Sequence, residues 1–126
     1  MENKDYTVEI LEIIRSNTSP GIMRSRLEDY HANDLAEVFP QLKVSERRKI
    51  CRILDLDMLS DIFEHIDEQE AAEYLDEMDI KKAAAILSAM ETDAVVDVLQ
   101  MIPKEKKNLL IELMDDDARK DMAIIA

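Results

Sequence analysis

The chain has few of the residues on which most enzyme sites depend. It contains one glycine, which excludes the glycine-rich loop that cradles a phosphate group in nucleotide-binding proteins. Its two histidines, His31 and His65, offer little choice of general base for a nucleophilic triad. Asp61 and His65 lie one helical turn apart, but without a second histidine or cysteine nearby we interpret them as a surface pair rather than a zinc site. We therefore predict that the protein is not an enzyme.

Cysteine, basic residues and aromatic residues are also scarce. The single cysteine, Cys51, excludes an internal disulfide and fits a reducing compartment. Lys and Arg number 16 against 29 Asp and Glu, a net charge of −13, and only 4% of residues are aromatic, so the surface repels nucleic acid. The apolar runs are too short to span a membrane, and the charged first residues lack a signal-peptide core. We expect a soluble, cytoplasmic chain that binds no nucleic acid and does not insert into a membrane.

What the sequence does contain is an apolar pattern with a period of twelve residues, which runs through seven consecutive units. Three positions in each unit are always apolar, and a fourth, three residues ahead of them, is apolar in most units. Together they follow i, i+3, i+4 and i+7 spacing, which is one face of an α-helix. The first position holds Val38, Ile50, Ile62, Tyr74, Ile86, Val98 and Leu110, the second Phe39, Cys51, Phe63, Leu75, Leu87, Leu99 and Ile111, and the third Leu42, Leu54, Ile66, Met78, Met90, Ile102 and Met114.

A single long helix cannot produce this period. Twelve residues rotate the apolar face by about 120°, so successive units of one helix would share no stripe. The chain must turn between units, and an aspartate, which is a favoured helix N-cap, follows the third apolar position in several of them. Helices of about nine residues are marginal alone and must pack on their neighbours. These observations predict an all-α solenoid in which the caps or their equivalents are Asp55, Asp67, Asp79, Glu91, Pro103 and Asp115.

Two parts of the chain depart from the repeat. Residues 1–20 are predicted to form an N-terminal helix, around Tyr6 to Arg15, and a helix-breaking segment. The breaking residues run from Ser16 to Gly21 and include the only glycine of the chain. Residues 21–126 are predicted to form the helical repeat, and the whole chain one compact domain. Arg47 and Lys107 break the fourth apolar position, and we expect their replacement by alanine to be nearly neutral.

Carboxylates are concentrated on the predicted outward face of the helices. Glu37, Asp61, Glu73 and Asp97 recur in one column, and Asp93 precedes Asp97 by one turn. Like charges at i, i+4 spacing cost about 0.2–0.5 kcal/mol. One interpretation is that these groups merely solvate the backs of the helices. The other is a site for a hard cation, because Mg²⁺ binds one or two carboxylates and keeps several waters.

From residue 31 onward the chain resembles the N-terminal cytosolic domain of the MgtE family of magnesium transporters and channels. The likeness is carried by HANDLA at 31–36, by IDEQEAAEYLDEMD at 66–79 and by the unbroken twelve-residue spacing. The resemblance implies a right-handed superhelix of short helices on the cytoplasmic side of a membrane. In the family this domain precedes CBS domains and a membrane domain, in a homodimeric protein. Because neither domain follows here, we expect an isolated domain or a truncated piece.

The resemblance also implies a regulatory function. The family's N-terminal domain closes against the CBS domains when Mg²⁺ is high, and acidic residues at that contact help to hold the ions. By position these residues correspond to Asp61, Asp93 and Asp97, whereas Glu37 and Glu73 come from periodicity alone. Since the CBS side supplies part of each ion's shell, the isolated domain should bind Mg²⁺ weakly. The alternative is an armadillo-like adaptor solenoid resembling the flagellar rotor switch domains, and a third reading is an enzyme subunit without catalytic residues of its own.

Overall fold

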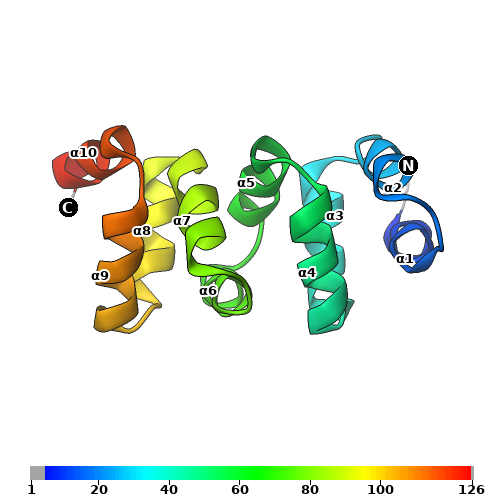
Figure 1. The fold of residues 1–126 in the computed structure, drawn as a ribbon, viewed down its shortest axis with the longest axis horizontal. Coiled ribbons are helices and arrows are strands. Elements are labelled where there is room, and N and C mark those ends of the chain that lie inside the picture. The colour runs from blue at the N-terminus through cyan, green and yellow to red at the C-terminus, as the bar shows by residue number, and fades with distance from the viewer. Residues whose placement is uncertain (1–4, 126) are drawn as a thin grey trace.

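The computed structural model describes residues 5–125, with side chains described for residues 5–122. Every regular element in this range is a helix, which confirms the all-α prediction (Figure 1). In chain order the elements are α1 (Thr7–Arg15), α2 (Pro20–Leu27), α3 (Ala32–Val38), the 3₁₀ helix η1 (Phe39–Gln41), α4 (Val44–Ile53), α5 (Leu56–Glu64), α6 (Glu68–Asp76), α7 (Ile80–Ala89), α8 (Thr92–Gln100), α9 (Lys104–Leu113) and α10 (Asp116–Ile125).

The apolar positions of the repeat form the core. All seven residues at the first position are buried. The second and third positions are buried as well, apart from Ile111 and Met78, which are half-buried and pack against the core. Phe63 and Leu87, for example, are 1% and 0% exposed. Because burying apolar side chains is the dominant favourable term in folding, the repeat explains why helices this short are stable together.

The turns between helices lie at the N-cap residues that the sequence predicted. Asp55, Asp67 and Asp79 each accept a backbone N–H from the first turn of the helix that follows. Each carboxylate thereby satisfies a donor that has no partner within its helix. Glu91 and Pro103 precede α8 and α9 in the equivalent places, without a side-chain cap.

The helices stack in two rows, in which a helix packs on the next but one, except between α4 and α6. In the odd row, α1, α3, α5, α7 and α9 follow one another in contact. In the even row, α2 packs on α4, α6 on α8, and α8 on α10. Figure 1 shows the resulting elongated arrangement, with α1 and α2 at one end and α10 at the other. This stacking agrees with the expected solenoid, and α1 covers its start by packing against α2, α3 and α4.

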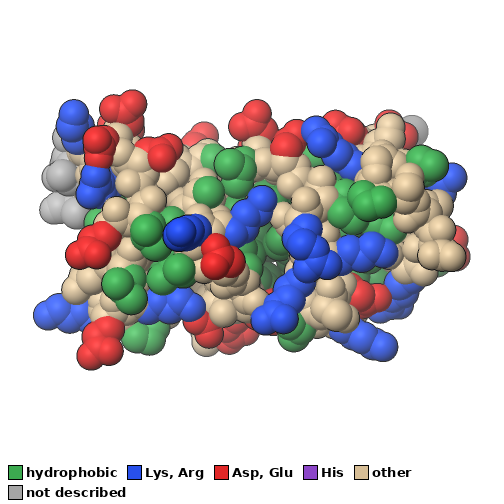
Figure 2. Space-filling model, in the orientation of Figure 1, with side chains coloured by type: hydrophobic (Ala, Val, Ile, Leu, Met, Phe, Trp, Pro, Cys, Tyr) green, Lys and Arg blue, Asp and Glu red, His purple; other side chains and the backbone are tan. Residues whose placement is uncertain are grey.

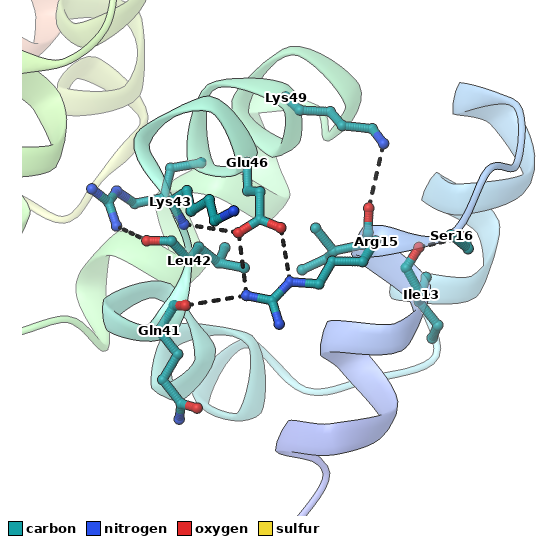
Figure 3. Close-up of polar contacts among 10 residues, drawn as sticks. Ile13, Arg15, Ser16, Gln41, Leu42, Lys43, Glu46 and Lys49 are labelled. Atoms are coloured by element: carbon teal, nitrogen blue, oxygen red, sulfur yellow. Dashed lines mark hydrogen bonds and ion pairs between the residues drawn. The ribbon is translucent and has the colours of Figure 1, made fainter.

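Hydrogen bonds connect α1 to α4 (Figure 3). The Arg15 guanidinium donates to the Glu46 carboxylate, with 2.8 Å between Nε and Oε2. The other oxygen of Glu46 accepts the backbone N–H of Lys43 at the start of α4, at 2.8 Å. Lys49 Nζ donates to the carbonyl of Ile14, at 3.3 Å. The bond from Arg15, assisted by that from Lys43, lowers the pKa of Glu46 to about 2.

Arg47 occupies one of the two breaks in the fourth apolar position, and it is half-buried. Its guanidinium donates to both oxygens of the Glu77 carboxylate, at 2.8 and 2.6 Å. It also donates to the carbonyls of Phe39 and Leu42, at 3.2 and 2.5 Å, and its Cζ lies 4.6 Å from the centre of the Tyr74 ring. The expectation that Arg47 is dispensable therefore needs correction, because the side chain connects η1, α4 and the end of α6.

Candidate metal-binding surface

Asp93 and Asp97 lie on α8, at its second residue and one turn later. Both side chains are exposed, as predicted. The positive end of the helix dipole favours Asp93 in the first turn, whereas its repulsion from Asp97 is unfavourable. Neither carboxylate forms a hydrogen bond or an ion pair with any residue in 5–122. The two groups are therefore free to receive a cation from solvent.

Asp61 lies near the middle of α5 and is also exposed. Its side chain borders a hollow of about 200 Å³ to which Glu28 and Tyr30 contribute. Its backbone carbonyl oxygen lies 2.8 Å from Nδ1 of His65, the C-cap residue that follows α5. This contact engages one nitrogen of the imidazole with the backbone of its own helix rather than with the Asp61 carboxylate.

The three predicted ligands do not form one cluster in this chain. Asp93 and Asp97 share a helix face, but Asp61 comes from α5, which is not among the helices that pack closely on α8. Among the described residues, no group of three or more Asp, Glu, His or Cys side chains is arranged to hold a metal ion. Glu37 on α3 and Glu73 on α6 are exposed as the periodicity predicts. A cation here could take one or two carboxylates from this chain and would need its remaining ligands from water or a partner.

Cys51 offers no reactive alternative. Its side chain is 4% exposed on α4. Burial raises the pKa of the thiol to about 11, so it stays protonated at neutral pH. This confirms the prediction of a buried, unreactive cysteine.

One group of polar residues was not found by the sequence reasoning. Arg48 and Arg52 on α4 line a hollow together with Lys82 on α7. The available signal was the basic run at 47–49, which stands out in an acidic chain. The twelve-residue pattern marks Arg47 only as an interruption of the apolar face and carries no information on Arg48 or Arg52.

The stack of short helices, with exposed carboxylates on its surface, defines the class of the protein as a helical-repeat domain. The chain belongs to the family of MgtE intracellular N domains, whose family model matches residues 30–125. Membership of this family of transporter domains confirms the predictions that the chain is intracellular and is not an enzyme. It also favours the transporter reading over the adaptor alternative.

Two solved structures are similar to the chain over almost its whole length. One is described as the soluble part of a magnesium transporter, with a TM-score of 0.84, 26% identity and coverage of 94% of this chain. The other is the cytosolic domain of the Mg²⁺ channel MgtE in complex with ATP, with a TM-score of 0.78, 25% identity and coverage of 93%. The chain spans 46% and 48% of the lengths of those two proteins. A comparison with curated protein sequences gives no significant match. None of the helices in the described range is long and apolar enough to cross a membrane.

Proposed function

We propose that this chain is the Mg²⁺-sensing regulatory domain of a magnesium transporter or channel. The observation that carries the proposal is the pair Asp93 and Asp97, which are exposed on one face of α8 and have no partner among the described side chains. Membership of the MgtE family supports Mg²⁺ as the cation. The relatives' description as a magnesium transporter and a Mg²⁺ channel supports it further.

The proposed mechanism is a change of charge balance at a closing interface. When Mg²⁺ is low, the carboxylates of Asp93 and Asp97 repel an acidic partner surface and the domains stay apart. When Mg²⁺ is high, ions shared between the two surfaces neutralise both, and the closed state is favoured because it binds ions better than the open state. In this scheme Asp61 supplies a ligand at a separate point of the same contact. The partner surface is that of CBS domains in the same polypeptide, within a homodimeric membrane protein.

A Mg²⁺ titration of the full-length protein tests this function, with protease protection of the segment that follows residue 126 as the readout. Wild-type protein should become protected as Mg²⁺ rises. In Asp93→Asn/Asp97→Asn, the transition should flatten or move, because fewer ligands link closure to the ion.

Asp117→Asn/Asp121→Asn is a matched control for that titration. These two carboxylates have the same spacing and the same places in α10 that Asp93 and Asp97 have in α8, and they are also exposed. The control should keep the wild-type midpoint and steepness. If Asp93→Asn/Asp97→Asn also keeps them, the two residues are not part of the sensor and the carboxylates serve only to solvate the helix.

A further inference from the structure

The even row of helices is interrupted between α4 and α6. These two helices pack much less closely than the other neighbours in the row, and a hollow of about 800 Å³ lies between α4 and the turn from α6 to α7. We call this hollow the α4 groove. Figure 2 shows a recess near the middle of the molecule with Lys and Arg side chains around it. The α4 groove is lined by Arg48, Cys51 and Arg52 from α4 and by residues between Asp76 and Lys82.

The three carboxylates of the α4 groove are already engaged by other groups. Asp76 forms an ion pair with Lys106 of α9. Glu77 is held by Arg47, with 2.6 Å between Nη2 and Oε2. Asp79 caps α7 by accepting backbone N–H groups of its first turn. Asp76 and Glu77 are therefore neutralised by basic side chains from outside the groove, whereas Asp79 keeps its negative charge at the N-terminus of α7.

The three basic side chains of the α4 groove are not balanced in this way. Within residues 5–122, the side chains of Arg52 and Lys82 form no hydrogen bond or ion pair. Arg48 uses only Nε, which donates to the carbonyl of Glu77 at 2.9 Å, so its two terminal nitrogens are available. Lys82 and Arg52 both line the groove, together with the buried Cys51. Three basic side chains without an acidic partner among the described residues therefore face one carboxylate that is not neutralised, that of Asp79, so the groove carries an excess of positive charge in a chain whose net charge is −13.

A second hollow continues this positive surface. It has a volume of about 470 Å³, lies between α2 and α4, and shares Arg52 with the α4 groove. Arg24 and Lys49 also line it, and none of its lining residues is acidic. The two hollows share Arg52 in their linings, and Arg24 of the second hollow is paired with Asp55 and Glu28.

We propose that the α4 groove binds a compact multivalent oxyanion, a small molecule that carries two or more phosphate or carboxylate groups. The planar fork of an arginine guanidinium pairs with the oxygens of either group, and two arginines and a lysine from two helices can contact several such groups at once. The volume of the groove falls in the range of small-molecule sites, roughly 300–1,000 Å³. None of the proposed Mg²⁺ ligands, Asp61, Asp93 and Asp97, lines it. The site is therefore separate from the metal-binding surface.

Titration of the 126-residue chain with inorganic tripolyphosphate and, separately, with citrate tests the site. Both titrations use low-salt buffer without Mg²⁺, which these anions would chelate. Binding is measured by calorimetry and located by amide chemical shifts in NMR spectra. We expect shifts confined to α4 and residues 76–82. In Arg52→Gln/Lys82→Gln, affinity should fall about 10-fold or more, because two charge-assisted contacts are lost. Tighter binding of one anion identifies the preferred oxyanion.

The matched control is Lys104→Gln/Lys120→Gln, which removes two exposed positive charges outside the α4 groove. It should keep wild-type affinity. An equal loss in the control, or shifts spread over basic residues throughout the chain, would show non-specific charge attraction and overturn the proposal. Absence of binding by both anions at millimolar concentration would overturn it too. Circular dichroism melts of both variants verify that affinity is compared between folded proteins.

Discussion

Arg47 and Glu77 are paired across the interruption in the even row, with 2.6 Å between Nη2 and Oε2. Their side chains are only 12% and 21% exposed. The pair is thus better shielded from solvent than an ordinary surface ion pair, and each group has further partners. Arg47 occupies a position that is apolar in most other units, so the ion pair stands in for an apolar contact at this place in the solenoid.

Replacing Arg47 by alanine should destabilise the chain. The change leaves the Glu77 carboxylate and the carbonyls of Phe39 and Leu42 without their donor in a half-buried place. We expect a loss of about 2–3 kcal/mol, below the full effect of breaking a completely buried pair. The measurement is urea unfolding followed by circular dichroism.

Lys107→Ala is the control for this change, because Lys107 breaks the same register position in α9 and is also half-buried. Its side chain forms no hydrogen bond or ion pair within residues 5–122. It should therefore change the free energy of unfolding by less than about 0.5 kcal/mol. Equal effects of the two substitutions would contradict the role assigned to the Arg47–Glu77 pair.

The contrast between Arg47 and Lys107 shows which features of the structure the sequence could predict and which it could not. The twelve-residue period predicted the buried positions and the capping residues because both depend on interactions within a helix or between repeated units. The partner of Arg47 lies 30 residues away. No local pattern specifies that contact, and the α4 groove beside it was missed for the same reason. The outward position of Asp61, Asp93 and Asp97 followed from helical periodicity, but their arrangement in space depends on how α5 and α8 are placed by the whole stack.

Truncation of a core residue tests whether the buried face of each helix has been assigned correctly. Leu87→Ala should cost about 2–5 kcal/mol, because it removes a fully buried side chain and leaves a cavity. Leu109→Ala is the matched control, since Leu109 is 52% exposed and its loss should change stability by less than about 0.5 kcal/mol. Urea unfolding measures both. The reverse order of effects would mean that the apolar face has been assigned wrongly.

The Arg15–Glu46 contact should make stability depend on pH below about 4.5. The pKa of Glu46 is lowered to about 2 from an ordinary value of 4.5, mainly by the hydrogen bond from Arg15. The folded chain therefore holds the charged form more strongly than the unfolded chain does. This contribution is present above the ordinary pKa and is lost as the pH falls toward 2.

An NMR titration of the Glu46 carboxyl carbon checks the pKa directly. In Arg15→Gln the titration should move up toward the ordinary value. Arg26→Gln removes an exposed arginine from α2 and should leave it unchanged. If Glu46 titrates normally in the wild-type chain, the contact in Figure 3 does not persist in solution.

The last prediction concerns Mg²⁺ and the 126-residue chain without a partner domain. On the proposed function, Asp93 and Asp97 supply only part of an ion's shell, so affinity should be weak. Thermal stabilisation should appear only at millimolar Mg²⁺ or above, following RT ln(1 + [L]/Kd).

Without Mg²⁺, Asp93→Asn/Asp97→Asn should melt at the wild-type temperature or slightly above it, because repulsion of about 0.2–0.5 kcal/mol is relieved. Added Mg²⁺ should stabilise this variant less than the wild-type chain, whereas Asp117→Asn/Asp121→Asn should respond as the wild type does. Tight, stoichiometric binding by the wild-type chain in calorimetry would contradict a shared site, because such binding requires a complete set of ligands from this chain alone.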